Sequence, residues 1–279
     1  MICISSLEEE RTLSYTLRMH ETLQLLNNRR SVRSFEDRII EPEALFQLKE
    51  ATLRAPTAGN MALYSIVEVH DSSKKEKLAK ICDEQSMIER APLVWVFLAD
   101  MQKWVNYFHE SGAVDRAEKA SLASFRKPGL GDLHLCLQDA VIAAQNAVVA
   151  AEALGLGSCY IGDVIEHFEQ LRDLLELKQY TIPACMLIFG YPKAKGPARP
   201  TPRCPQDSIF MQDRYEEPHL EQLQKAYKVH EEDRRRSQSL PYQNTGTLAD
   251  YYYLRKHTSA FMQEMNRSTS VMFDWWCNG

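Results

Sequence analysis

The sequence has few of the short patterns by which common classes of protein are recognised. Its seven cysteines are scattered over 279 residues, are odd in number and form no Cys-x-x-Cys pair. This arrangement argues against a disulfide framework and against a zinc site, and it favours a reducing compartment. Acidic residues outnumber basic residues by 38 to 33, which gives a formal net charge of −5. Such a chain is not expected to bind nucleic acid, because that binding needs a basic face.

Nucleotide and membrane signatures are missing as well. No Gly-x-Gly-x-x-Gly follows a strand pattern and no Gly-x-x-x-x-Gly-Lys-Ser/Thr occurs, so side chains must hold the phosphate of any bound nucleotide. The apolar stretches fall short of the roughly 20 residues that a membrane span needs. The N-terminal SSLEEER differs from the basic and then apolar start of a signal peptide. We therefore expect a cytoplasmic protein without a membrane partner.

The pattern of the chain is that of an α+β protein. Apolar residues make up 44% of the sequence, enough to bury a substantial core. Apolar residues at helical spacing predict long helices, and β-branched and aromatic runs predict a minority of strands between them. Thr247 and Asp250 fit a capping box at the start of the last helix. The predicted helices are 19–28, 41–56, 132–155, 166–177, 218–237 and 247–265, and the predicted strands are 63–69, 92–99 and 184–192.

We divide the chain into three parts. A polar, weakly patterned extension covers 1–18, the main domain covers 19–215, and a helical C-terminal extension covers 216–279. Within the main domain, residues 101–130 form an aromatic-rich insertion between a strand and the longest helix. No internal repeat and no low-complexity segment is found.

The segment NNRRSVRSF concentrates positive charge where a helical pattern stops. Arg29, Arg30 and Arg33 surround Ser31. A guanidinium group can donate two parallel hydrogen bonds to the oxygens of one phosphate, and a serine hydroxyl adds a neutral donor. The segment is therefore a candidate anion site. The alternative is a solvated basic turn whose arginines pair with nearby acids.

A second candidate segment, RAPTAGN, leads from a predicted helix into a predicted strand. Pro56, Ala58 and Gly59 are small or rigid, so a planar ligand can approach the backbone closely. Asn60 offers both an amide donor and an acceptor. The alternative is an ordinary helix-to-strand connection.

The ordered set RRSVRSF, APTAGN, LGLGSCYIGD and GYPKAKGPARPTPR resembles the FMN-dependent nitroreductase family over residues 20 to about 205. The resemblance implies a central mixed or antiparallel sheet flanked by long helices. It also implies an intertwined homodimer with an FMN site at each subunit interface. Many relatives carry Gln-Pro-Trp where this chain has Ala62, Leu63 and Tyr64.

The resemblance also implies roles for residues of this chain. Arg29 and Ser31 would bind the phosphate and ribityl side of FMN, and Arg33 would lie near the N1 and O2 edge of the isoalloxazine. The loop that lines the ring would come from the other subunit, and Arg203 would return to the phosphate. The implied cofactor-binding residues are Arg29, Arg30, Ser31, Arg33, Pro56, Thr57, Ala58, Asn60, Tyr160, Ile161, Gly162 and Arg203.

The implied activity is hydride transfer from NAD(P)H to FMN and then to a nitroaromatic, quinone or similar electron-poor acceptor, by a ping-pong mechanism. Flavin N5 carries the hydride, so no catalytic side chain is expected. Reductive dehalogenation, enone reduction and reduction of free flavin are alternatives on the same fold. An FMN-binding module without turnover is a third possibility. A helical interaction protein that binds no flavin is a fourth.

The remaining predictions concern the insertion and the tail. Within 101–130, Trp104, Tyr107, Phe108 and Phe125 are candidates to stack on a flat acceptor, with plain packing as the alternative. We expect the tail, 216–279, to wrap the partner subunit. The aromatic residues that favour this interpretation are Tyr251, Tyr252, Tyr253, Phe261, Trp275 and Trp276.

Overall fold

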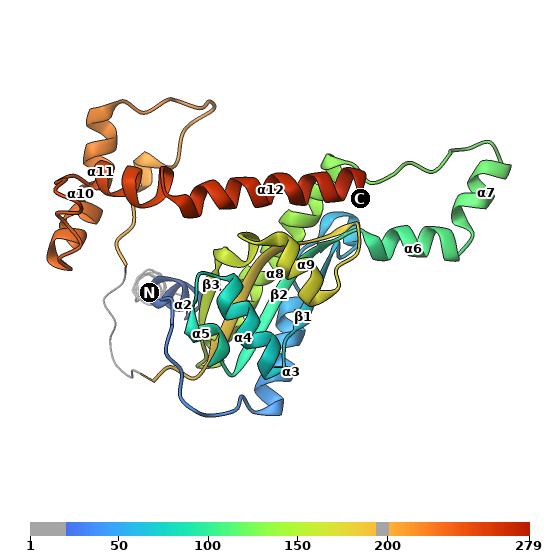
Figure 1. Cartoon of the computed structure of the whole chain (residues 1–279), viewed down its shortest axis with the longest axis horizontal. Coiled ribbons are helices and arrows are strands. Elements are labelled where there is room, and N and C mark those ends of the chain that lie inside the picture. The colour runs from blue at the N-terminus through green and yellow to red at the C-terminus, as the bar shows by residue number, and fades with distance from the viewer. Residues whose placement is uncertain (1–20, 194–200) are drawn as a thin grey trace, which may run out of the picture.

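The computed structural model describes residues 21–193 and 201–279 (Figure 1). Its strands are β1 (Tyr64–Glu68), β2 (Leu93–Asp100), β3 (Gly157–Ile161) and β4 (Thr181–Gly190). Its helices are α2 (Glu21–Asn28), α3 (Pro42–Leu53), α4 (Ser72–Ile81), α5 (Ser86–Glu89), α6 (Gln102–Glu110), α7 (Ala113–Lys119), α8 (Leu130–Ala153), α9 (Phe168–Leu175), α10 (Leu220–Arg236), α11 (Leu248–Tyr252) and α12 (Ala260–Asn278). The short helical turns are η1 (Ala58–Asn60), η2 (Gly162–Ile165), η3 (Gln206–Ser208) and η4 (Tyr253–His257).

The four strands form one antiparallel sheet in the order β1-β2-β4-β3. This confirms the α+β class and the strands predicted at 63–69, 92–99 and 184–192, although β4 begins three residues earlier than predicted, at Thr181. The sequence did not predict β3, because Gly157 and Ser158 weaken the strand signal in this short segment. The predicted N-terminal extension, 1–18, lies outside the described residues.

The sheet is covered on both faces. Every residue of β2 is buried, as expected for a strand between two helical layers. Trp95 and Phe97 face α8, whereas Val94 and Val96 face the layer that contains α4, α5 and α9. This alternation follows from the two-residue repeat of a strand.

Helix α8 is the central helix of the fold. Most of its alanines, including Ala140, Ala144 and Ala147, are fully buried against β2 and β4 and allow a close approach of helix and sheet. By length and composition α8 could cross a membrane, which the sequence analysis did not anticipate. Its buried face identifies α8 as a core helix. Its opposite face exposes Leu135, Val141 and Ile142.

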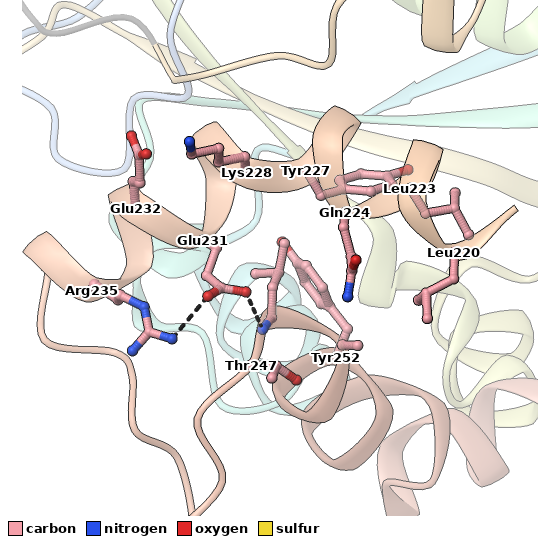
Figure 2. Close-up of a pocket in the computed structure, with 12 residues that line it drawn as sticks. Leu220, Leu223, Gln224, Tyr227, Lys228, Glu231, Glu232, Arg235, Thr247 and Tyr252 are labelled. Carbon is pink, nitrogen blue, oxygen red and sulfur yellow. Dashed lines mark hydrogen bonds and ion pairs between the residues drawn. The ribbon is translucent and has the colours of Figure 1, made fainter. Parts of the chain in front are cut away.

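Helices α10 and α11 form a hairpin that stands off the sheet (Figure 1). Glu231 of α10 joins the two helices, because its carboxylate accepts the backbone N–H of Leu248 in α11 at 3.0 Å (Figure 2). The same carboxylate pairs with Arg235 of its own helix at 2.8 Å. Thr247 Oγ1 accepts the N–H of Asp250 at 3.1 Å and so confirms the predicted capping box.

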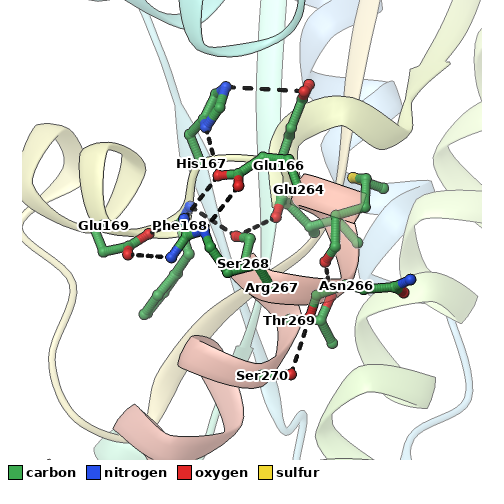
Figure 3. Close-up of polar contacts among 12 residues, drawn as sticks. Glu166, His167, Phe168, Glu169, Glu264, Asn266, Arg267, Ser268, Thr269 and Ser270 are labelled. Atoms are coloured by element: carbon green, nitrogen blue, oxygen red, sulfur yellow. Dashed lines mark hydrogen bonds and ion pairs between the residues drawn. The ribbon is translucent and has the colours of Figure 1, made fainter. Parts of the chain in front are cut away.

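Helix α12 packs on the body of its own chain. Trp276 is fully buried, and its indole N–H donates to Gly129 O at 3.2 Å. Ser268 accepts the N–H of Phe168 at 3.0 Å and donates to Ile165 O at 2.7 Å (Figure 3). The apolar residues of α12 therefore contribute to the core of its own subunit. That the tail wraps the partner subunit stays a prediction.

A polar network surrounds this contact between α9 and α12 (Figure 3). Arg267 pairs with Glu169 at 2.7 Å and with Glu264 at 2.7 Å, while His167 Nδ1 lies 3.0 Å from Glu264 Oε1. Glu166, at the edge of the network, is 8% exposed, and its Oε2 has no hydrogen-bond partner. Burial therefore raises the pKa of Glu166 above its ordinary value of 4.5.

We predict that Glu166→Gln stabilises the protein near neutral pH. Because the folded chain binds the Glu166 proton more tightly than the unfolded chain, this stabilising contribution is complete below pH 4.5 and is lost as pH rises through the raised pKa. The variant should gain about 1 kcal/mol, or roughly 2–4 °C in melting temperature, at pH 7.5. The gain should disappear below pH 4.5. Melting curves across this pH range test it, with the exposed Glu89→Gln as control; a gain that persists in acid would contradict it.

Candidate functional site

The arginine segment is fixed to the β3 edge of the sheet through its backbone. The N–H of Val32 donates to Ser158 O at 2.9 Å, and Ser31 forms a parallel bridge with Ser158. Val32 is buried while Ser31 and Arg33 are exposed. At Gly157, a Cβ would lie 2.6 Å from the Val32 side chain, so only glycine permits this close approach. Because Val32 is held against β3, the side chains of Ser31 and Arg33 on either side of it face the solvent.

Arg29 and Arg203, far apart in the sequence, line the same pocket of about 260 Å³. Leu26, Asn27 and Thr201 complete its lining, so no acid contributes to the described lining. Arg203 Nη1 is 3.2 Å from the carbonyl oxygens of Thr201 and Pro202, which fix its position. Two guanidinium groups at one polar pocket form an arrangement suited to a phosphate.

The sequence did not indicate one acid whose pKa is affected by the arginine segment. Glu152 on α8 is half-buried, and Arg29 and Arg30 oppose the rise in its pKa that burial causes. Glu41, by contrast, pairs with Arg38 and with the Tyr191 hydroxyl. Glu152 of α8 therefore contributes negative charge near the arginine segment.

The end of β3 adjoins the arginines. Tyr160 is 37% exposed, and its hydroxyl lies 3.4 Å from Gln145 Oε1 of α8. Burial raises the pKa of Tyr160, and the positive charge of Arg29 opposes this rise. Ile161 is only 1% exposed and packs in the core, so it can offer a ligand only its backbone. Gly162 is exposed and begins η2.

The second predicted segment, Pro56 to Leu63, is a tightly turned loop before β1. Gly59, Asn60 and Ala62 have φ angles of 57°, 57° and 48°, in the left-handed region. For Asn60 and Ala62 this conformation is strained and persists only where surrounding contacts enforce it. Pro56 and Asn60 are exposed, so the loop presents a small polar surface.

Asp139 of α8 enforces this loop conformation. The carboxylate is 3% exposed and accepts the N–H groups of Ala58 and Leu63, both at 3.0 Å, together with the Thr57 hydroxyl. Thr57 Oγ1 in turn accepts the N–H of Ala62 at 2.8 Å. The Thr57 proton is therefore committed to Asp139, and its hydroxyl does not donate to a ligand. The sequence signal that could have revealed Asp139 is an acidic residue within an alanine-rich helix.

The arginine segment and the loop lie at diagonally opposite corners of the sheet. The loop enters β1 at Tyr64, which pairs with Ala99 near the end of β2, whereas Ser158 pairs with Phe189 and so aligns with Leu93 at the start of β2. Three strand spacings of about 4.8 Å and six residues of about 3.3 Å separate these corners by more than roughly 20 Å. One chain cannot bring both segments to the same flat ring.

The aromatic candidates of the insertion fall into two groups. Trp104 donates its indole N–H to Met61 O at 2.9 Å and packs against Tyr107 and Phe108, with ring centroids 5.7 and 5.6 Å apart. Phe125 lies further along, 4.5 Å from the His109 ring, and shares with Phe108 a pocket of about 200 Å³. The first group adjoins the loop, and helices α6 and α7 project away from the sheet (Figure 1).

Comparison with known proteins identifies the fold and its family. The model of the nitroreductase family matches residues 26–191, which contain the arginine segment, the loop and β3. The chain belongs to the nitroreductase family. Nitroreductase A from Vibrio parahaemolyticus has a similar fold, with a TM-score of 0.75, 23% identity, and coverage of 91% of this chain and 98% of that chain.

Curated relatives of this nitroreductase-family chain have named activities. FMN reductase [NAD(P)H] of Bacillus subtilis (strain 168) is 32% identical over 202 residues, which are 71% of this chain and 75% of the relative. Oxygen-insensitive NADPH nitroreductase of Salmonella typhimurium is 26% identical over 199 residues, 71% of this chain and 76% of the relative. Residues 192–279 lie outside the family match.

We predict that Asp139→Asn weakens the loop and, with it, the site. An amide has one acceptor oxygen in place of two, so at least one of the three donors loses its partner, at about 1–3 kcal/mol. Urea denaturation should show a loss of this size. Asp173→Asn, which changes an exposed carboxylate paired with Arg172, is the matched control and should change stability by less than about 1 kcal/mol. Equal stability of the two variants would contradict the proposed role.

Proposed function

We propose that the chain is an FMN-dependent oxidoreductase that takes a hydride from NAD(P)H and passes it to an electron-poor acceptor. The observation that carries the proposal is the convergence of Arg29 and Arg203 on one polar pocket in a chain of the nitroreductase family. When bound, FMN supplies the hydride chemistry at N5. The residues of the chain bind and orient the cofactor and set its electrostatic surroundings.

The residues of the phosphate pocket fit the cofactor. A nucleotide that is not held by a glycine-rich loop needs side-chain cations, and Arg29 and Arg203, from distant parts of the sequence, would provide them. Arg33 follows Val32, whose N–H donates to Ser158 of β3, and its charge opposes the rise in the pKa of Cys159 that burial causes. A cation at this position would favour the anionic reduced form of a bound flavin. Cys159 itself is 2% exposed and is a packing residue.

A homodimer completes the site. Because the arginine segment and the loop of residues 56–63 lie at opposite corners of one sheet, a second copy must bring its loop to the arginines of the first. The exposed face of α8, with Leu135, Val141 and Ile142, is the apolar surface on which two copies can meet.

A cytoplasmic location, expected from the sequence, remains part of this proposal.

The acceptor is a flat, electron-poor molecule such as a nitroaromatic or a quinone. Trp104, Tyr107 and Phe108 of the partner would travel with its loop and stack on such a molecule. A ping-pong mechanism follows, since NAD(P)H and acceptor would share the space above the cofactor. Free flavin is a second candidate acceptor, because the relative from Bacillus subtilis is named FMN reductase.

We predict that Arg29→Ala and Arg203→Ala each weaken FMN binding. Charge-assisted hydrogen bonds contribute about 1.5–3 kcal/mol each, so affinity should fall on the order of tenfold or more. Quenching of FMN fluorescence during titration measures this loss. The control is Arg214→Ala, which removes an exposed guanidinium paired with Glu216 and should leave affinity unchanged. Unaltered affinity in both site variants would place the phosphate elsewhere.

A second prediction concerns turnover. The protein reconstituted with FMN should lose its yellow absorbance when NADH or NADPH is added without oxygen, and it should regain it when a nitroaromatic, a quinone or free FMN follows. Stopped-flow absorbance at the flavin band measures both half-reactions. Binding of FMN without bleaching by either nicotinamide would indicate a binding module, and failure to bind FMN at all would refute the proposal.

A further inference from the structure

The segment of residues 102–129, which we call the arm, is anchored to the body of the chain at its two ends. It leaves the body after β2 and rejoins it at the start of α8 (Figure 1). It contains α6 and α7, and neither helix has a buried residue. Leu122 and Tyr107 are 81% and 62% exposed. The direction of the arm is therefore set at the two points of attachment, which we call its roots.

The first root, at Met101 and Gln102, is held by a backbone carbonyl group. Tyr180 O accepts the N–H of Met101 at 3.0 Å and the N–H of Gln102 at 3.3 Å. The side chain of Tyr180 is buried, and its ring packs edge-on against the ring of Trp276 in α12, with centroids 5.6 Å apart. Trp276 therefore supports the residue that fixes the first root.

The second root, at Pro128 and Gly129, contacts the same tryptophan directly. Trp276 Nε1 donates to Gly129 O at 3.2 Å, and the neighbouring Pro128 is buried. Asp132 of α8 accepts the N–H of Gly129 at 2.8 Å and pairs with Arg126 of the arm at 2.6 Å. Trp276 thus acts on both roots, on one through a hydrogen bond and on the other through Tyr180.

Helix α12 keeps Trp276 in place. Trp276 is fully buried in the core cluster that also contains Met101 and Met272, and Trp104 of the arm packs against this cluster. About two turns earlier in α12, Ser268 bonds to α9 and η2 (Figure 3). Figure 1 shows α12 ending where the arm meets the body of the chain. The end of α12 is therefore a rigid support for both roots.

The arm is also bonded to the loop of residues 56–63. Trp104 donates its indole N–H to Met61 O at 2.9 Å, and Lys103 Nζ donates to Tyr64 O at 2.5 Å. A rotation of the arm about its roots would therefore move its aromatic side chains relative to this loop. The space between arm and loop depends on how firmly the roots are held.

We propose that Trp276 is a positioning residue for the acceptor, because it holds both roots of the arm and so sets the width of the space in which the acceptor lies. The inference rests on the proposed function, in which Tyr107 and Phe108 of the arm stack on a flat acceptor. Trp276 itself lies outside the residues that match the family model, 26–191. Looser roots would let the arm stand further out, so wide acceptors would gain over compact ones.

The variant Trp276→Phe tests this role in the full chain reconstituted with FMN. It keeps an aromatic ring in the core and removes the N–H that Gly129 O accepts. We compare kcat/KM for a wide acceptor, dinitropyrene, with kcat/KM for a compact one, dinitrobenzene. The ratio of wide to compact should rise about 3- to 10-fold, the range expected for one hydrogen bond. A merely destabilised enzyme loses active molecules for both acceptors equally, which leaves the ratio unchanged.

The matched control is Trp275→Phe, the same change one residue earlier. The Trp275 indole N–H donates to Lys178 O at 3.3 Å, and Arg172 Cζ lies 4.8 Å from the centre of its ring. Neither partner belongs to a root of the arm, so this variant should leave the ratio unchanged. A ratio that stays the same in Trp276→Phe, or that rises equally in Trp275→Phe, overturns the inference.

Amide hydrogen exchange of the unaltered protein gives a measurement that needs no variant. If α12 holds the roots, the amides of Met101 and Gln102 should open only when α12 detaches. Their protection factors should then lie within about tenfold of that of the Phe168 amide, which donates to Ser268 of α12. Protection at the first root that is lower by more than about a hundredfold means that the arm opens while α12 stays bound, and it also overturns the inference.

The two measurements separate this inference from the proposed function. A protein that fails to bind FMN, or is not bleached by NAD(P)H, refutes the proposed function and with it the acceptor role of Trp276, whatever hydrogen exchange shows. A protein that reduces both nitroaromatics with the same ratio in Trp276→Phe keeps the proposed function and loses this inference alone.

Discussion

The contact between Val32 and the β3 edge is the constraint on which the phosphate pocket depends. The backbone of the arginine segment bonds to Ser158, and the absence of a side chain at Gly157 lets Val32 lie directly on the strand. A similar close approach recurs at Gly190, where a Cβ would lie 2.9 Å from Phe35. Because the side chains of Val32 and Phe35 are buried, the directions in which the neighbouring side chains point are fixed. The position of Arg29 is thus set by apolar packing and backbone hydrogen bonds rather than by its own charge.

Helix α8 joins the two halves of the site. Its C-terminal part contributes Glu152 beside the arginines, and its N-terminal half contributes Asp139 to the strained loop. The same helix packs its alanines on the sheet and exposes an apolar face on the other side. A shift of α8 would therefore change the loop, the charge balance at the arginines and the surface for a second copy together. This sharing explains how one rigid helix can hold a site whose parts lie at distant corners of the sheet.

Two segments expose apolar side chains that the described chain leaves uncovered. They are residues 102–129, where Leu122 is 81% exposed, and the hairpin of α10 and α11, where Leu220 is 70% exposed. Helix α12 differs, because Trp276 and Met272 are buried and the Ser268 contacts fix it to α9 and η2. The parts of the C-terminal extension therefore differ in burial: the last helix completes the core of the subunit, whereas α10 buries only Ala226.

The sequence alone identified the strands β1, β2 and β4, the long helix α8 and the arginine cluster that contains Arg29, because strand and helix periodicity and charge clusters are local properties. Arg203 was implied by the family resemblance and not by any local pattern. The sequence also indicated the family through four ordered motifs. It did not reveal β3, Asp139 or Glu152, since a glycine-rich strand and single acids in a helix have weak local signals. Aromatic content in the tail predicted a contact with the partner, but burial of Trp276 depends on which surface lies nearest in the fold.

What the sequence by itself determined was the kind of site: guanidinium groups for an anion and a small-residue loop for a flat ligand. Only the tertiary structure decided where these parts lie. The register of four antiparallel strands places them at opposite corners, and register depends on hydrogen bonds between residues far apart in the chain. Hence a local motif indicates the ligand chemistry, whereas the separation of the two candidate segments emerges from strand pairing.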